Sequence, residues 1–328
     1  MRLAVVAALL GAVALASCGG GDDEERTGGK QGPLERSIAD AGRVTKADFP
    51  AAGGRTLQEI ADSLEPGLNV GLATSVHVPG RNRLAFGLFD SENANVFARS
   101  AVYVARTPAD DARGPFPAPL DSMVPAGRFL STTVARERAS PKAVYETRVP
   151  FDASGRYAVL VVSKLRGRLL GGTTEITVAP ASPIPDVGER PPATETPTVA
   201  SVGGDIARIE TRVPPDSMHR VSFRDVLGRR PVALLFATPA LCESRTCGPV
   251  TDLAEQLKAS YGRRAAFIHN EVYAGNDPAK GLRPQLEAFH LESEPWLFTF
   301  DRDGRVAARL EGAFGIDEFR RAVEAAIR

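Results

Sequence analysis

The sequence predicts a multidomain chain in which an antiparallel β-sandwich is followed by an α/β domain. Three observations support this prediction. Short strand-like segments separated by turn residues fill the first half, a proline-rich stretch interrupts the chain at 179–198, and strand and helix patterns alternate after it. A hydrophobic content of 43% and a charged content of 24% are typical of globular domains.

The N-terminus has the pattern of an export signal. Arg2 precedes an apolar run at 3–15, which is too short to span a bilayer. The junction Leu15-Ala16-Ser17-Cys18 resembles the lipobox of bacterial lipoproteins. The resemblance implies that residues 1–17 are removed as a lipoprotein signal peptide and that Cys18 carries a lipid anchor. We therefore expect the protein at the extracytoplasmic face of the bacterial cell membrane, where disulfides are permitted. An ordinary secreted protein with an incidental cysteine is the alternative.

Residues 18–50 are expected to form a flexible tether, because they begin with the hydrophilic stretch GGGDDEERTGGKQG. The whole chain has 40 basic and 40 acidic residues, and its formal net charge is zero. This balance argues against nucleic acid as a partner and against electrostatic attraction to anionic lipids.

Residues 51–179 are predicted to form the sandwich. The predicted strands are 69–78, 83–90, 101–106, 145–151, 157–164 and 174–179. A turn cluster at 152–155 (DASG) predicts a hairpin, and GPFPAP at 114–119 predicts an ordered loop. Several short strands with polar turns are typical of an immunoglobulin-like sandwich. The only histidine here, His77, is expected to be structural or solvated, and the domain to recognise or position a partner.

Residues 180–200 are predicted to be a semi-rigid linker, because closely spaced prolines prevent a helix or a central strand. Residues 201–328 then follow the order β-α-β-α-β-β-α. The predicted strands are 231–237, 265–273, 296–300 and 305–312, and the predicted helices are 249–261, 281–291 and 317–327. A tight hairpin is predicted at 301–304 (DRDG).

Three motifs in this order resemble the thioredoxin-like superfamily, in the branch of thiol-disulfide lipoproteins and peroxiredoxins. They are DVG at 186–188 with the prolines after it, FATPALCESRTCGP at 236–249, and EPWLFTFDRDGRV at 294–306. The resemblance implies a thioredoxin-like domain at 201–328 in which Pro295 is a cis-proline facing the thiols. Glu294 and Pro295 would then line a groove for an extended substrate strand, and a surface charge is an equal alternative for Glu294. Trp296 is expected first to pack in the core, with the groove wall as its alternative.

Cys242 and Cys247 are the residues most informative about chemistry. A helix N-terminus stabilises a thiolate, so Cys247, directly before Gly248-Pro249, is expected to be the nucleophile and Cys242 the resolving thiol. The spacing C-x4-C differs from the C-x-x-C of thioredoxins, where the second cysteine stands at the position of Val250. That difference leaves the redox potential and the attacking thiol open. The main hypothesis is thiol-disulfide exchange with a protein partner and without a cofactor.

Three alternatives remain open. In a non-catalytic binding scaffold, the cysteines would form a structural disulfide, which stabilises so short a loop by only about 2 kcal/mol. A copper chaperone similar to the Sco type would use Cys242, Cys247 and His269 as ligands, since thiolates suit Cu(I). Met218 and His219 are further ligand candidates, although His219, His269 and His290 are all expected to have structural roles first. A peroxidase ranks third, because Thr246 lies next to Cys247 rather than upstream at the usual spacing.

Overall fold

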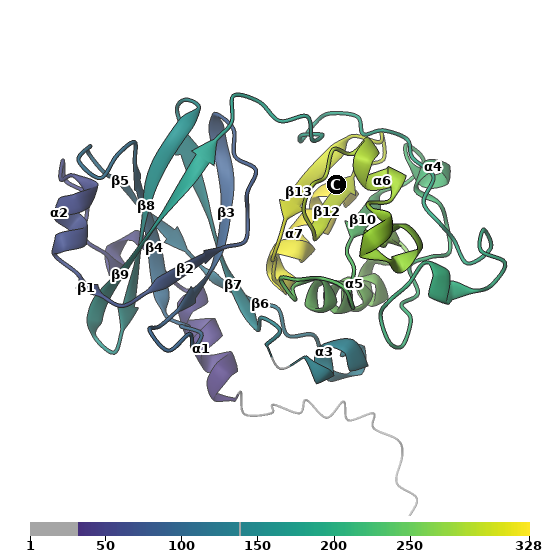
Figure 1. Cartoon of the computed structure of the whole chain (residues 1–328), viewed down its shortest axis with the longest axis horizontal. Coiled ribbons are helices and arrows are strands. Elements are labelled where there is room, and N and C mark those ends of the chain that lie inside the picture. The colour runs from purple at the N-terminus through teal and green to yellow at the C-terminus, as the bar shows by residue number, and fades with distance from the viewer. Residues whose placement is uncertain (1–31, 138) are drawn as a thin grey trace, which may run out of the picture.

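The computed structural model describes residues 32–137 and 139–328. A two-sheet sandwich and an α/β domain lie side by side, and the chain crosses between them after β9 (Figure 1). The predicted signal peptide and Cys18 lie outside the described residues. In the part of the chain that is described, no helix combines the length and the apolar character needed to cross a membrane.

The sandwich consists of two sheets that share one core. The first sheet has the order β1-β9-β8-β4-β5, with bounds Glu65–Pro66, Arg168–Val178, Gly155–Leu165, Arg99–Ala105 and Arg113–Ala118. The second has the order β2-β3-β7-β6, with bounds Asn69–Leu72, Gly80–Phe89, Ala143–Phe151 and Leu120–Ser122. All neighbours are antiparallel except β1 and β9. Phe86 and Tyr145 of one sheet pack with Val102 and Val159 of the other. The immunoglobulin-like type of this sandwich stays a prediction.

Two local predictions in the sandwich are wrong. Residues 114–119 were expected to be a loop, but most of them belong to β5, an edge strand where prolines are tolerated because one side of the strand needs no partner. The turn at 152–155 is present but joins β7 to β8, which lie in different sheets, so it closes no hairpin. Turn residues determine where the chain reverses direction. Which strand the following strand pairs with depends instead on where its apolar face is buried.

Residues 33–50 correct the prediction of a flexible tether. They include the helix α1 (Pro33–Gly42) and the short 3-10 helix η1 (Lys46–Asp48). Ile38 and Ala41 of α1 are buried against the sandwich core. The guanidinium of Arg99 forms ion pairs with Asp40 and Asp48, which hold the segment on β4. Two further short helices, α2 (Leu57–Asp62) and α3 (Thr132–Arg136), complete this half of the chain.

The α/β domain is built on a four-stranded sheet with the order β11-β10-β12-β13. The bounds are Ala266–Asn270, Val232–Phe236, Trp296–Phe300 and Val306–Glu311. β10 and β11 are parallel, whereas β12 is antiparallel to both β10 and β13. The strands therefore occur where the sequence predicts them, and the hairpin at 301–304 joins β12 to β13 as expected.

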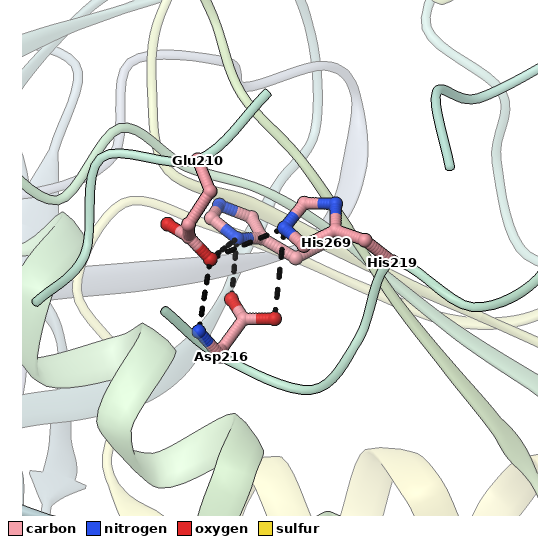
Figure 2. A group of neighbouring side chains, drawn as sticks. All are labelled: Glu210, Asp216, His219 and His269. Carbon is pink, nitrogen blue, oxygen red and sulfur yellow. Dashed lines mark hydrogen bonds and ion pairs between the residues drawn. The ribbon is translucent and has the colours of Figure 1, made fainter. Parts of the chain in front are cut away.

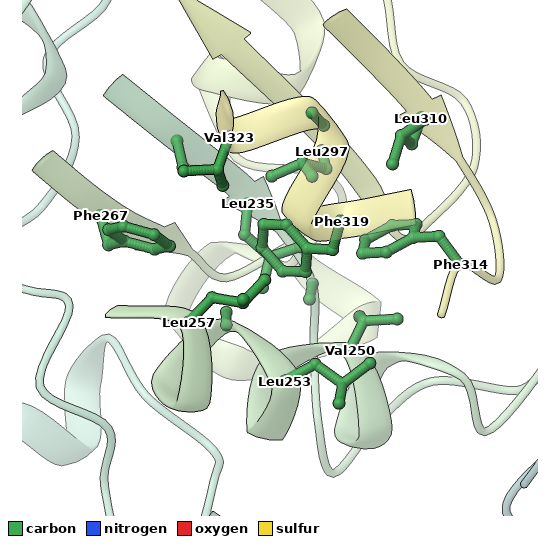
Figure 3. Close-up of a cluster of buried hydrophobic side chains, with 14 of the residues drawn as sticks. Leu235, Val250, Leu253, Leu257, Phe267, Leu297, Leu310, Phe314, Phe319 and Val323 are labelled. Atoms are coloured by element: carbon green, nitrogen blue, oxygen red, sulfur yellow. The ribbon is translucent and has the colours of Figure 1, made fainter. Parts of the chain in front are cut away.

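Helices cover this sheet unequally. The long helices α5 (Cys247–Tyr261) and α7 (Ile316–Ile327) pack on one face, where Leu253, Leu297 and Phe319 meet (Figure 3). The other face carries α4 (Phe223–Val226), the short α6 (Pro284–Ala288) and a cluster of aromatic side chains that includes Phe289 and Phe298. The predicted helix at 281–291 is therefore shorter than expected.

The proline-rich segment 180–200 has no helix or strand, as predicted, but it packs against the α/β domain instead of separating the two domains. Ile184 is buried in the aromatic cluster. The N–H of Gly188 donates to the carbonyl of Val306 at 2.8 Å, and the N–H of Val306 donates to the carbonyl of Glu189 at 2.9 Å. The segment therefore extends the edge of the sheet at β13.

Buried polar contacts join the two domains. The guanidinium of Arg83 on β3 donates to both carboxylate oxygens of Glu318 on α7, each at 2.7 Å. The carboxylate of Asp121 on β6 accepts the backbone N–H of Asp317 and of Glu318, and it thereby caps the N-terminus of α7. These groups lie about 200 positions or more apart in the sequence, so only the tertiary structure brings them together.

Candidate functional site

Cys242 and Cys247 lie in and after the loop that leaves β10, and both are free thiols. Cys247 is the first residue of α5 and is fully buried, whereas Cys242 is partly exposed. Their sulfur atoms and one carboxylate oxygen of Glu294 all lie within 4.8 Å of one another. We call these three residues the thiol site. The structure thus brings together the two predicted cysteines and one of the two predicted groove residues.

The two thiols differ in acidity. A hydrogen bond from the Cys247 thiol lowers the pKa of Cys242 to about 5, with further contributions from Ser244 and from the backbone N–H groups of Cys247 and Thr246, while burial opposes the shift. The hydroxyl of Ser244 lies 3.2 Å from the Cys242 sulfur. Burial raises the pKa of the Cys247 thiol well above its ordinary value. The directions of the two shifts favour the thiolate form at Cys242 and the protonated form at Cys247.

This arrangement reverses the roles that the sequence suggests. The expectation placed the thiolate on Cys247 because that residue starts the helix. In the structure, the N–H groups at the helix start and the neighbouring hydroxyl stabilise the Cys242 sulfur instead. Cys247 is 0% exposed and packs with Val250 and Leu253 in the core, so Cys242 is the thiol that is accessible from solvent.

Glu294 and Pro295 precede β12 directly. The Glu294-Pro295 peptide bond is cis, as the resemblance implies. Burial raises the pKa of Glu294 to about 7, and the negative charges of Cys242 and Glu243 add to the shift. A carboxyl group that titrates near neutral pH is suited to accept or donate a proton during exchange at the adjacent sulfur atoms.

Trp296 packs in the core, which is the role expected first for it, and it does not line a groove at the thiol site. Its side chain is 2% exposed and stacks on Phe298, with ring centroids 5.7 Å apart. Its indole N–H donates to the hydroxyl of Ser293 at 3.1 Å. Because side chains alternate along β12, Trp296 faces the aromatic cluster while the next residue, Leu297, faces the core that contains Cys247.

A cleft of about 620 Å³ opens beside the thiol site, between the two domains; we call it the interdomain cleft. The α/β domain contributes Ser244, Thr246 and Glu294 to its lining. The lining from the sandwich is mostly small or apolar and includes Gly71, Leu72, Ala73, Gly87, Phe89, Ala143, Val144 and Ile176. Sequence reasoning missed this wall, because nothing in the strand pattern of the sandwich indicates which of its edges meets the second domain.

One glycine allows the close approach of the domains at this cleft. Gly312 follows β13 and has φ +67°, a value that side chains rarely adopt. Its N–H donates to the carbonyl of Pro295 at 2.8 Å. A Cβ at this position would lie 1.7 Å from the backbone oxygen of Ala73, at the end of β2. The chain of the sandwich therefore touches the residue that is hydrogen-bonded to the cis-proline.

His269, the histidine considered as a copper ligand, does not belong to the thiol site. Both ring nitrogens of the buried His269 are engaged, Nδ1 by Asp216 at 2.7 Å and Nε2 by the carbonyl of Ala237 at 3.0 Å. The expected copper ligand set of Cys242, Cys247 and His269 is therefore not assembled.

The remaining candidate residues have structural positions. His77 is buried, as one of its two alternatives predicts, and its Nε2 lies 3.4 Å from the hydroxyl of Thr74. His290 is exposed at the surface. The hydroxyl of Thr246, the residue weighed for a peroxidase, lies 2.7 Å from that of Ser244.

Comparisons with known proteins give little further information. No protein-family model matches the chain, and no curated protein matches it. The crystal structure of a candidate thiol:disulfide interchange protein DsbE from Chlorobium tepidum is similar over 44% of this chain and 99% of its own, with 18% identity and a TM-score of 0.31. The solution structure of the PKD domain of human VPS10 domain-containing receptor SorCS2 matches over 52% and 99%, with 14% identity and a TM-score of 0.18.

Proposed function

We propose that this protein exchanges thiols and disulfides with a protein partner through Cys242 and Cys247, in a domain of the thioredoxin-like superfamily. One observation carries the proposal. A partly exposed thiol whose pKa is about 5 lies within 4.8 Å of a buried thiol that keeps its proton. This asymmetry supplies the two functions that exchange requires, an accessible nucleophile and a protected resolving group.

The reaction follows from the geometry in two steps. The Cys242 thiolate attacks one sulfur of a partner disulfide, the partner's S–S bond breaks, and a mixed disulfide with Cys242 forms while the other partner sulfur leaves as a thiolate. Cys247 then transfers its proton to Glu294 and attacks the sulfur of Cys242, which releases the second partner sulfur as a thiolate. The partner disulfide gains two electrons, and the cysteine pair is oxidised to a disulfide. The reverse sequence oxidises a partner dithiol.

The interdomain cleft supports a protein substrate rather than a small thiol. Its lining from the sandwich is largely apolar, and it opens at Ser244, Thr246 and Glu294 beside the reactive sulfur. An exposed, extended segment of a partner protein has the apolar side chains that such a wall would bury. In this proposal the sandwich selects the substrate and the α/β domain performs the chemistry.

The location of the protein belongs to the same proposal. Lipidation at Cys18 would hold both domains at the extracytoplasmic face of a bacterial membrane, where disulfide exchange has substrates. Cys18→Ser tests this directly, because the variant should lose incorporation of labelled palmitate and leave the membrane fraction. Incorporation that persists in Cys18→Ser contradicts the anchor, although it leaves the chemistry of the thiol site untouched.

Mutation of each cysteine tests the exchange. Cys242→Ser and Cys247→Ser should both reduce the turnover of insulin disulfides to the background rate. Only Cys247→Ser should accumulate a mixed disulfide, because it keeps the attacking thiol and lacks the resolving one. Ser91→Ala, at an exposed turn of the sandwich, is the matched control and should keep full activity. Unchanged turnover in Cys242→Ser, or a Cys242–Cys247 disulfide that never opens under mild reductant, contradicts the proposal and favours the scaffold.

A further inference from the structure

A second group of ionisable side chains is sealed inside the α/β domain. Glu210, Asp216 and His219 lie in the irregular chain between the 3-10 helix η3 (Ile206–Arg208) and α4, and His269 lies on β11 (Figure 2). We call these four residues the His-carboxylate cluster. Their side chains are between 0% and 1% exposed. Neither the proposed exchange reaction nor the interdomain cleft uses any of them.

The polar atoms of the cluster converge on one point. Nδ1 of His269 lies 2.7 Å from Oδ2 of Asp216 and 3.6 Å from Oε2 of Glu210. Nε2 of His219 lies 3.1 Å from the same Glu210 oxygen and 3.6 Å from Oδ1 of Asp216. One ligand atom from each residue lies within 4.8 Å of all the others. Four ligands of a tetrahedral zinc ion, bound at 2.0–2.2 Å, are about 3.3–3.6 Å apart, so small movements of these side chains would suffice.

Hydrogen bonds from outside the cluster hold the ligand atoms in place. Nε2–H of His269 donates to the carbonyl of Ala237, so Nδ1, which lies 2.7 Å from Oδ2 of Asp216, is the ring nitrogen that would bind an ion in place of the proton it shares with Asp216. The N–H of Arg212 donates to the outer oxygen of Glu210, and the N–H of Met218 donates to Asp216, each at 2.7 Å. Such outer contacts to histidine and carboxylate ligands are typical of metal sites, where they orient the ligands.

Charge balance points to a divalent ion. The contacts at 2.7 Å and 3.1 Å between ring nitrogens and carboxylate oxygens each require a shared proton. Two carboxylates with two neutral imidazoles carry a charge of −2, which is costly in a buried site unless it is compensated. A divalent cation compensates this charge in the same way as two protons. The nearby guanidinium of Arg212 is already paired with Asp252 at 2.7 Å.

We propose that the His-carboxylate cluster binds one divalent transition-metal ion of the zinc type through Glu210, Asp216, His219 and His269. The mixed nitrogen and oxygen ligands favour Zn²⁺ over Mg²⁺ and Ca²⁺, which prefer oxygen ligands alone. Three of the ligands lie in the irregular segment between η3 and α4, and the fourth lies on β11. The ion would therefore attach this segment to β11. Because the carbonyl of Ala237 accepts from His269, it also supports the end of β10, from which the loop with Cys242 departs.

The experiment must separate this site from the thiols, because sulfur atoms are also zinc ligands. The full-length protein carrying both Cys242→Ser and Cys247→Ser is therefore titrated with Zn²⁺ and, separately, with Co²⁺. We expect one ion per chain and a Co²⁺ spectrum with tetrahedral d–d bands but no sulfur-to-metal charge-transfer band. Mg²⁺ at the same concentrations should not compete. A thiol-free protein that binds no Zn²⁺ contradicts the proposal.

Two conservative variants identify the ligands in the same thiol-free background. His219→Gln and Glu210→Gln keep hydrogen-bonding side chains of similar size, and each should weaken Zn²⁺ binding by about 100-fold or more. His290→Gln, at an exposed histidine, is the matched control and should bind normally. Near-ultraviolet circular dichroism of the metal-free variants verifies that they are folded. Equal affinity in His219→Gln and in the control places the ion elsewhere and overturns the proposal. Insulin reduction by the protein with both cysteines intact is a separate measurement, so either proposal can fail alone.

Discussion

The thiol site and the His-carboxylate cluster both lie close to the end of β10, but they differ in access and in symmetry. The carbonyl of Ala237 accepts a hydrogen bond from His269, and the backbone of the next residue, Thr238, donates to the sulfur of Cys247. The thiol site borders the interdomain cleft through Glu294, and the pKa shifts of its two thiols are opposite in direction. The His-carboxylate cluster is closed, and its four ligand atoms face one another.

The comparison indicates that exposed ionisable groups are available for reaction, whereas fully buried ones contribute mainly to the stability of the fold. A partly exposed thiolate exchanges with a partner, and its environment determines how fast. Closed ionisable groups contribute mainly to folding, because removing one partner leaves an uncompensated charge in the interior. Three substitutions and one chemical-modification experiment test this contrast between the two sites.

The largest effect is expected from His269→Ala in the metal-free protein. Because the change leaves Glu210 and Asp216 buried without the imidazole, we expect the free energy of unfolding to fall by about 3–5 kcal/mol. Urea denaturation measures this loss. Glu292→Ala, at an exposed residue of the same domain, is the control and should change stability by less than about 0.5 kcal/mol. A small loss in His269→Ala would show that the cluster is not a stability element.

The second effect concerns the acidity of the two thiols. Alkylation of reduced protein by iodoacetamide at pH 7, followed by peptide mass spectrometry, should modify Cys242 more than about 100-fold faster than Cys247, since each pKa unit above the pH reduces the thiolate tenfold. The rate at Cys242 should rise with pH to a plateau, with a midpoint near 5. Faster modification of Cys247 would restore the roles that the sequence suggests.

The third effect tests the wall that the sandwich contributes. Gly312→Ala places a Cβ against the backbone of Ala73 and forces φ +67° on alanine, so we expect a loss of about 2 kcal/mol in the free energy of unfolding. Insulin reduction should fall as well, because the clash would push the sandwich side of the interdomain cleft away from the thiol site. Gly54→Ala has a similar φ of +77° without any atom within 4 Å of the added Cβ, and it therefore separates backbone strain from the steric clash.

The smallest effect is expected from Glu294→Gln. The carboxyl has a pKa of about 7, so it accepts the Cys247 proton in its ionised form, which is populated above pH 7. The rate of the resolving step should therefore rise through pH 7 in the native protein. In Glu294→Gln this rise should disappear, and the rate at pH 8 should drop about tenfold, since solvent replaces the base only in part. Stopped-flow measurement of mixed-disulfide resolution gives both quantities. A pH profile that keeps its midpoint near 7 in the variant assigns the proton transfer to another group.

The four strands and the two long helices of the α/β domain could be predicted, whereas α4 and the 3-10 helices of this domain were not. β10, β12 and β13 are continuous or alternating apolar runs bounded by turn residues, and α5 begins with Gly248-Pro249 near its first turn. The cis peptide bond at Pro295 was predicted from the resemblance rather than from any local pattern. In the sandwich, by contrast, short helices such as α1 bury too few residues to produce a recognisable period.

From the sequence, the strand-rich half, the alternating α/β half and the start of a helix near Cys247 could be predicted, because those features depend on neighbouring residues. Only the tertiary structure decided which thiol is the thiolate, since the answer depends on which sulfur faces solvent and which N–H groups reach it. The tertiary structure also places the apolar edge of the sandwich beside Glu294. It places His269 against Glu210 and Asp216, whereas the copper alternative placed this histidine with the thiols. Burial and electrostatic contact are properties of three-dimensional proximity, and residues far apart in the chain carry no local signal of it.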